Sequence, residues 1–305
     1  MSISKQNSNL VKLFSLLSVV RGYNILVLIA AQYLAAIFIF SPEKSLKHII
    51  FDIHLLYLIL ATASVVSAGY IINSFYDSKL DLINRPLKTG LDSQIKEETK
   101  LSLYFLLNFV GAAFGFLISW RAAVFFSVYI FGIWIYSHKL KKYALTGLIS
   151  ATVLTVLPFF AVFVYFKNFQ KVIFVHALFL FLVIMVRQLI KNLENIKGAI
   201  ANNYKTFPVV YGERKTKQFS LLLLVFTLIP MLILFRYTGL GYMRYYFHLA
   251  MITLIFVGWY LWFANSKNQY RLLHNILKAL LLIGILGLIF IDTSLLVEKV
   301  IEKLN

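Results

Sequence analysis

Residues 70–86 read YIINSFYDSKLDLINRP and end a long apolar segment with a group of polar side chains. On a continuous helix, which turns by about 100° per residue, one narrow face would carry two carboxylates and two amides, those of Asn73, Asp77, Asp81 and Asn84. Such oxygen ligands suit Mg²⁺, which usually binds proteins through one or two carboxylates together with substrate phosphates. A solvated helix end is the alternative interpretation, but carboxylates beside a membrane span usually face a polar cavity. The stretch therefore predicts a magnesium site.

The whole chain has the composition of a membrane protein, because 60% of its 305 residues are hydrophobic. The first apolar run lacks a small-residue cleavage pattern, so we expect a retained helix. The sequence predicts an all-α polytopic membrane protein, with one domain over residues 1–305. Nine apolar runs are each long enough to cross a bilayer, at about residues 13–40, 54–76, 101–119, 122–137, 143–166, 172–190, 218–235, 245–264 and 276–297.

The distribution of positive charge predicts the orientation of these spans. The chain has 30 Lys and Arg residues and a net charge of +18. If the N-terminus is cytoplasmic, most of these residues lie on that side, as the positive-inside rule requires. We therefore expect a cytoplasmic N-terminus, an outside C-terminus and a cell inner membrane location, with the lipid bilayer as partner and no nucleic acid. The chain has no cysteine, which excludes disulfides and thiolate metal sites.

Further polar segments lie at the predicted cytoplasmic ends of other spans. Residues 136–142 read YSHKLKK and predict a phosphate grip formed by Tyr136 and the lysines, or alternatively only an orientation signal. Residues 185–199 read MVRQLIKNLENIKGA and again extend an apolar run into a polar segment. The first run carries Arg21 and Asn24, and Arg21 either snorkels to the interface or takes part in a polar site.

Taken together, these segments resemble the UbiA superfamily of membrane-embedded prenyltransferases. The first signature of that family, Asn-Asp-x-x-Asp-x-x-x-Asp, is similar to NSFYDSKLD at residues 73–81, with Ser74 in place of the first Asp. Further agreement comes from Arg21 and Asn24, INRP at 83–86, the turn from Tyr136 to Lys141, and KTFPVVYG at 205–212. The resemblance implies a nine-helix bundle around a central cavity, in which two polar motifs hold a prenyl diphosphate through Mg²⁺ at the cytoplasmic end.

The second signature departs from the family pattern, because KNLENIKGA at residues 191–199 lacks three of the expected acids. On a helix, Gln188, Asn192 and Asn195 share one face, whereas Glu194 points away from them. We expect Glu194 to pair with Lys191 or Arg187 rather than to replace a metal ligand. Two hypotheses follow: an active transferase in which amides and lysines compensate for the acids, or a non-catalytic isoprenoid-binding homologue. A transporter is less favoured, because the polar residues gather at one end rather than at the midplane.

The resemblance implies a role for each candidate residue. The catalytic and metal-binding residues would be Asn73, Asp77 and Asp81. The substrate-binding residues would be Arg21, Asn24, Tyr70, Asn84, Arg85, Tyr136, Lys139, Lys141, Arg187, Gln188, Lys191, Asn192, Asn195 and Lys205. Tyr70 would stabilise an allylic cation by its ring face. The substrates would be a polyprenyl diphosphate and an acceptor, which is geranylgeranylglyceryl phosphate in the most similar subgroup, or alternatively an aromatic quinone precursor of the hydroxybenzoate or naphthoate type.

Overall fold

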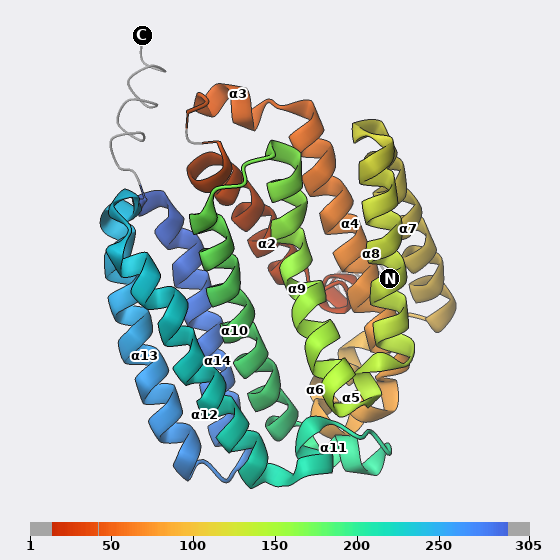
Figure 1. Cartoon of the computed structure of the whole chain (residues 1–305). Helices are drawn as coiled ribbons and strands as arrows, with labels where there is room; N and C mark the ends of the chain where they lie inside the picture. Colours follow the sequence, from red (N-terminus) through yellow and green to blue (C-terminus); the bar gives the residue numbers. More distant parts are fainter. Residues whose placement is uncertain (1–13, 42, 292–305) are drawn as a thin grey trace, which may run out of the picture.

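The computed structural model describes residues 14–41 and 43–291, and within these ranges the chain forms a helical bundle (Figure 1). Nine helices of the described part are long and apolar enough to cross a membrane, which confirms the predicted spans. They are α2 (Gly22–Ala35, continued by η1, Ala36–Phe40), α4 (Ile53–Tyr76), α7 (Glu97–Ile118), α8 (Trp120–His138), α9 (Ala144–Phe166), α10 (Lys171–Glu194), α12 (Phe207–Arg236), α13 (Arg244–Phe263) and α14 (Lys267–Gly287). The chain ends, whose sides the charge pattern predicts, lie outside the described residues.

Three helix starts differ from the predicted ones by nine residues or more. Helix α2 begins at Gly22 because Arg21 adopts a left-handed backbone conformation, with φ 51° and ψ 52°. Helix α12 begins eleven residues before the predicted 218 and contains a break at Gly212, whose φ of 82° favours glycine. Helix α14 begins before the predicted 276, because Ser266 and Gln269 form a capping box that starts the helix within a polar segment.

Helices α4 and α10, which carry the two polar motifs, are central to the packing. Helix α4 packs along α7, where Gly111 lies against Val65 of α4 so closely that a Cβ would clash. Helix α10 packs against α12 and α14 through a buried face that includes Val186 and Leu189. Both helices are therefore fixed along their length, and the segments that follow them have defined positions.

Short helices gather at one end of the bundle, the lower end in Figure 1, which we call the polar end. They are α5 (Ser78–Asn84), α6 (Pro86–Asp92), η2 (Leu140–Lys142) and α11 (Ile196–Ala201), whereas α3 (Leu46–Ile50) lies at the opposite end. The backbone N–H of Lys205 donates to the carbonyl of Lys142 over 2.8 Å, and α5 packs against α11. The segments that follow α4, α8 and α10 therefore meet at the polar end.

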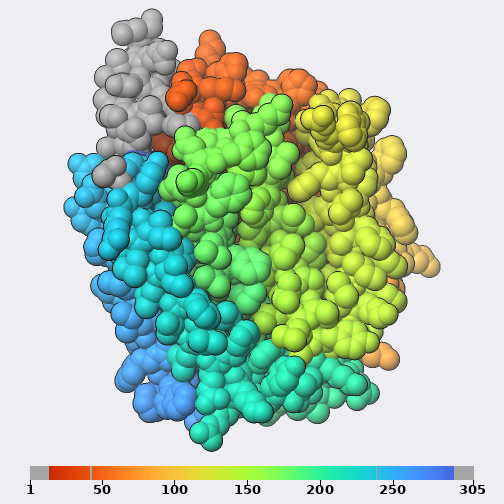
Figure 2. Space-filling model, in the orientation of Figure 1, coloured from red at the N-terminus to blue at the C-terminus, as the bar shows by residue number. Residues whose placement is uncertain are grey.

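Apolar side chains cover the outside of the bundle. Figure 2 shows one face of it, formed by α8, α9, α10 and α12. Large apolar side chains of α9 and α12 are exposed on this bundle, among them Leu145, Ile149, Val153, Val225, Ile229 and Leu232. Lipid is the natural environment for such a surface, since soluble proteins rarely expose apolar patches of this extent.

Candidate active site

The helix that carries the first motif is not continuous. Helix α4 ends at Tyr76, Asp77 has φ −94° and ψ 6°, and α5 begins at Ser78. The assumption of one helix through residue 84 is therefore wrong. The break nevertheless leaves Asn73, Asp77 and Asp81 on the wall of one small cavity of about 90 Å³ at the polar end.

This small cavity brings together residues from distant segments of the chain. Beside the three first-motif residues, its wall contains the predicted residues Arg21, Arg85, Tyr136, Lys141, Gln188, Lys191, Asn192 and Asn195. Two carboxylates thus share the wall with four Lys or Arg side chains and with the amides of α10 and of the residue that follows it. The combination of oxygen ligands, cations and amide groups suits a diphosphate bound together with a hard cation.

Asp77 is held by groups from two other segments. It is 9% exposed, and its Oδ1 lies 2.7 Å from Nζ of Lys141, which also donates to Oδ1 of Asn73 over 3.1 Å. The hydroxyl of Tyr204 donates to the same Oδ1 of Asp77 over 3.2 Å. Burial and the negative charge of Asp77 raise the pKa of Tyr204, so the phenol keeps its proton and remains a donor. Lys141 and Tyr204 therefore fix the position of the first-motif carboxylate.

The second motif has the same kind of break with different chemistry. Helix α10 ends at Glu194, and Asn195 has φ −102° and ψ 14°. Nδ2 of Asn195 donates to the carbonyl of Lys191 over 2.9 Å, whereas its buried Oδ1 has no hydrogen-bond partner among the described residues. An acceptor oxygen buried on the cavity wall without a partner is costly unless a ligand or cation satisfies it.

Glu194 faces away from this cavity, as the helical periodicity predicts. The expected partner is wrong, because Nε of Arg271 in α14 donates to Oε1 of Glu194 over 3.2 Å, in place of Lys191 or Arg187. Glu194 is 6% exposed. It is absent from the wall of the small cavity and from the wall of a second, larger cavity that is described below. It therefore joins α10 to α14 and does not restore the missing acids of the second motif.

Three predicted binding residues lie outside both cavities. Asn84 follows the helix break and is buried against α11. The contact is so close that a Cβ added to Gly198 of α11 would lie 2.4 Å from Nδ2 of Asn84. Lys139 precedes the tight turn η2, which directs Lys141 inward and leaves Lys139 exposed. Lys205 joins η2 through its backbone, and its side chain is exposed. The structure does not bring these three side chains to the site.

A larger cavity of about 500 Å³ extends from the polar end into the bundle. The predicted residues Asn24 and Tyr70 lie on its wall, and the guanidinium of Arg21 is 4.8 Å from the centre of the Tyr70 ring. Arg21 therefore points inward and does not snorkel to the interface. Helix α10 lines this cavity from His176 to Lys191, which corresponds to about 22 Å of helix at 1.5 Å per residue.

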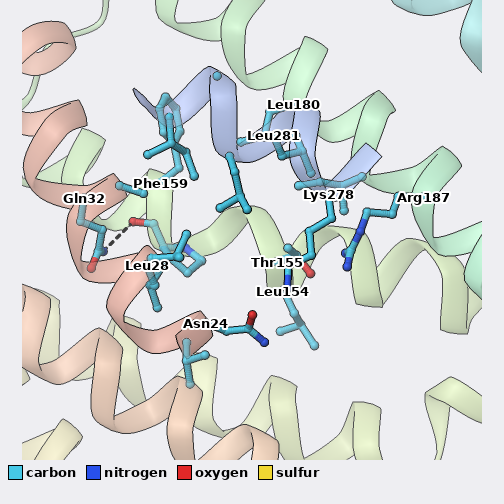
Figure 3. Close-up of a pocket in the computed structure, with 18 of the residues that line it drawn as sticks. Asn24, Leu28, Gln32, Leu154, Thr155, Phe159, Leu180, Arg187, Lys278 and Leu281 are labelled. Atoms are coloured by element: carbon cyan, nitrogen blue, oxygen red, sulfur yellow. Dashed lines mark hydrogen bonds between the residues drawn. The ribbon is translucent and has the colours of Figure 1, made fainter. Parts of the chain in front are cut away.

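The wall of the large cavity is mainly apolar away from the polar end (Figure 3). Pro158 has no N–H to donate to the carbonyl of Leu154, and the hydroxyl of Tyr129 donates to that carbonyl over 3.0 Å instead. Gln32 donates to the carbonyl of Pro158 over 3.0 Å, the bond drawn in Figure 3. These bonds fix α2, α8 and α9 around a space that would accept a long apolar chain.

Several polar residues of the cavities were not predicted as site residues, among them Tyr204 and Lys278. Tyr204 lies in the loop before α12 and directly precedes the KTFPVVYG segment at 205–212, so the resemblance offered a signal for it. Lys278 lies on the wall of the large cavity, within the ninth apolar run. A lysine inside a membrane span usually lines a polar pathway or site, so the position of Lys278 in the sequence is itself a signal of a site residue.

The donor set of the small cavity fits Mg²⁺ only in part. Asn73, Asp77 and Asp81 offer oxygen ligands, and the described residues contain no group of three His, Cys, Asp or Glu side chains able to hold a metal ion. Two carboxylates and an amide leave coordination positions that substrate phosphates and water normally supply for Mg²⁺. The site therefore suits a metal that arrives with a diphosphate rather than a metal held by protein alone.

The helical membrane bundle contains an apolar cavity next to a polar end. This arrangement defines a class of intramembrane protein whose site suits an amphipathic substrate. The model of the UbiA prenyltransferase family matches residues 28–282. The chain belongs to this family and is a membrane prenyltransferase.

Similar proteins share one name. A digeranylgeranylglyceryl phosphate synthase of Methanobrevibacter smithii is 29% identical over 234 residues, which cover 74% of this chain and 80% of that protein. The synthase of the same name from Korarchaeum cryptofilum is 23% identical over 246 residues, which cover 79% of this chain and 86% of that protein.

Solved structures of the family share the fold. A structure described as digeranylgeranylglyceryl phosphate synthase in membranes has a TM-score of 0.70 and 21% identity, and the match covers 91% of this chain and 97% of that one. A UbiA homologue from Archaeoglobus fulgidus bound to GPP and Mg²⁺ has a TM-score of 0.66 and 14% identity, with 90% and 99% covered. At these identities the likeness concerns the fold alone.

Proposed function

We propose that this protein transfers a geranylgeranyl group from its diphosphate to geranylgeranylglyceryl phosphate, a step in the synthesis of an ether lipid. One observation carries the proposal: a small cavity with two carboxylates and four cations adjoins a large, mainly apolar cavity, and Arg21, Asn73, Tyr136, Gln188 and Lys191 line both. A prenyl diphosphate combines the same two chemistries. The relatives named digeranylgeranylglyceryl phosphate synthase support this acceptor.

The diphosphate would bind in the small cavity. Asn73, Asp77 and Asp81 would hold Mg²⁺ together with phosphate oxygens, and bound Mg²⁺ would neutralise the charge that develops on the leaving diphosphate. Lys141 and Lys191 would add positive charge next to the same oxygens, and the N–H groups of the α10 amides would donate to them. In other family members, the acids of the second motif would hold metal that contacts the diphosphate. Here cations and amide donors would contact the diphosphate in place of that metal.

The prenyl chain would occupy the large cavity, whose apolar wall excludes the water that would otherwise capture an allylic cation. The C–O bond to the diphosphate breaks, and both of its electrons leave with the diphosphate. Tyr70 lies on the wall of the large cavity, and its ring would stabilise positive charge on the allylic carbon. The acceptor hydroxyl then forms the new C–O bond and loses its proton.

We further propose that the polar end faces the cytoplasm of a cell inner membrane. The support is the concentration of Lys and Arg in the segments of that end, which follows the positive-inside rule. The chain has no cysteine, so Lys205→Cys would introduce a single thiol at an exposed position of the polar end. A membrane-impermeant thiol reagent should label it in inverted membrane vesicles and not in intact cells; labelling in intact cells alone would reverse the orientation.

The function is tested with purified protein in lipid vesicles that contain Mg²⁺, labelled geranylgeranyl diphosphate and one acceptor at a time. We expect a labelled diether phosphate with geranylgeranylglyceryl phosphate, and none with hydroxybenzoate or naphthoate acceptors. Lipid extracts of cells with and without the gene provide the second measurement, in which an ether lipid should be missing. A quinone missing from the extracts of cells without the gene would indicate an aromatic acceptor instead. Binding of geranylgeranyl diphosphate in the vesicles without formation of any product would indicate a non-catalytic binding protein.

A further inference from the structure

The large cavity has an unbalanced charge. Four cationic side chains lie on its wall, those of Arg21, Arg187, Lys191 and Lys278, and its wall contains no carboxylate. In the described part of the chain, none of the four forms an ion pair. Unpaired charges within a membrane span are costly, and they usually mark the place where a charged ligand binds.

The four cations divide into two pairs by position. Arg21 and Lys191 also line the small cavity, where Asp77 and Asp81 lie, so a diphosphate and its metal account for them. Arg187 and Lys278 line only the large cavity and have no acidic counterpart there. This second pair is the part of the charge that the diphosphate site does not explain.

Arg187 and Lys278 come from different helices and reach the same part of the cavity. Arg187 lies on α10 and Lys278 on α14, and Figure 3 shows both side chains projecting into the cavity. Nε of Arg187 is buried and has no hydrogen-bond partner among the described residues, and Nζ of Lys278 lies 5.0 Å from the centre of the Tyr23 ring. The guanidinium of Arg187 and the ammonium of Lys278 could therefore both donate hydrogen bonds to one anionic ligand.

We infer that Arg187 and Lys278 form a second anion site, which binds the phosphate of the prenyl acceptor. The inference rests on the proposed function, in which the acceptor is a phosphomonoester. A guanidinium and an ammonium suit a doubly charged phosphate, because the first offers a planar pair of donors and the second a compact charge. Arg187 precedes Lys191 by one turn of α10, about 6 Å along the helix, so the acceptor head would lie one turn deeper than the diphosphate.

The site is tested by equilibrium binding of geranylgeranylglyceryl phosphate and of the corresponding alcohol without phosphate, using purified protein in lipid vesicles. The wild type should bind the phosphorylated lipid more tightly than the alcohol. Lys278→Met and Arg187→Gln should each reduce this preference by about 10-fold, because each removes one charged hydrogen-bond donor to phosphate. Binding of geranylgeranyl diphosphate should change by less than about 3-fold. Matched controls are Lys215→Met and Arg214→Gln, which remove exposed charges on α12.

Charge-preserving variants separate binding from folding. Lys278→Arg should retain most of the phosphate preference, whereas equal loss in Lys278→Arg and Lys278→Met would overturn the inference. An unchanged preference in both neutral variants would also overturn it, while transfer to geranylgeranylglyceryl phosphate by the wild type would leave the proposed function intact. If the wild type instead transfers to hydroxybenzoate and shows no phosphate preference, both proposals fail.

Discussion

The two polar motifs share a backbone arrangement and differ in chemistry. Helices α4 and α10 are each followed by a residue of nearly the same conformation, Asp77 with φ −94° and Asn195 with φ −102°, and then by a short helix at the polar end. On the first side two carboxylates line the small cavity; on the second side amides and Lys191 do. The breaks after α4 and α10 thus direct side chains to the small cavity in the same way, although the side chains are carboxylates in the first motif and amides in the second.

This difference indicates how the charge of a bound diphosphate would be balanced. With acids on both sides, metal ions would supply most of the positive charge, because each metal needs carboxylate ligands. With acids on one side only, we expect one metal at the first motif and direct contacts to the phosphates from the second. The first motif should therefore respond most strongly to mutation, and the contacts between the two sides should rank next.

The largest effect is expected for the carboxylates of the first motif. Asp77→Asn and Asp81→Asn should each lower kcat/KM by about 100-fold or more, since each removes a charged ligand of the proposed metal site. The measurement is prenyl transfer at saturating acceptor across a range of Mg²⁺ concentrations. Full activity in either variant at high Mg²⁺ with no shift in the Mg²⁺ dependence would contradict the assignment.

A smaller effect is expected for Lys141, which contacts both Asn73 and Asp77. Lys141→Met should lower kcat/KM by about 10- to 100-fold, because partners that orient metal ligands have effects of this size. Lys139→Met serves as comparison, since the structure leaves that side chain exposed two residues away. Equal losses in the two variants would mean that the turn acts only as a general source of positive charge.

The contact between the two short helices is tested by Gly198→Ala. The added methyl would lie within 2.4 to 2.7 Å of the Asn84 side chain, so α5 and α11 would have to separate. Such overpacking typically costs about 1 to 3 kcal/mol of stability. Thermal unfolding in detergent should show a lower midpoint than in the wild type. Gly90→Ala is the control, because a Cβ there meets no atom within 4 Å; equal midpoints for the two variants would disprove the close contact.

The smallest effect is expected for Glu194. Glu194→Gln should change Mg²⁺-dependent diphosphate binding by less than about 3-fold, since the side chain pairs with Arg271 and does not line the small cavity. A loss as large as that of Asp77→Asn would show that Glu194 reaches the metal after all.

The sequence predicted the parts of the molecule that depend on local pattern. Nine spans follow from apolar runs, because only helices satisfy backbone hydrogen bonds in lipid. The four-residue spacing of Asp77 and Asp81 likewise placed both carboxylates on one cavity. Asn84 was misplaced because the helix breaks at Asp77, and the partners of Asp77, Lys141 and Tyr204, come from distant segments that no local pattern contains.

The remaining errors concern contacts between distant segments. Both Lys139 and Lys141 were predicted to bind substrate, but only Lys141 points into the site. The turn η2 sets which lysine points inward, and its direction depends on the helices around it. The pairing of Glu194 with Arg271, and the presence of Lys278 and Arg187 on one cavity wall, both require the position of α14 against α10. Helical periodicity gave the direction of Glu194 correctly, but it contains no information on which helix lies there.

In the proposed site, the amides of the second motif face the same bound diphosphate as the carboxylates of the first. The most direct test is the Mg²⁺ concentration that gives half-maximal geranylgeranyl diphosphate binding in Asn192→Asp, in Asn195→Asp and in the double variant, with the exposed Asn203→Asp as control. If both faces line one site, the added acids should lower this concentration by about 10-fold, since carboxylate charge raises metal affinity. An unchanged or higher concentration in all three variants would contradict the account.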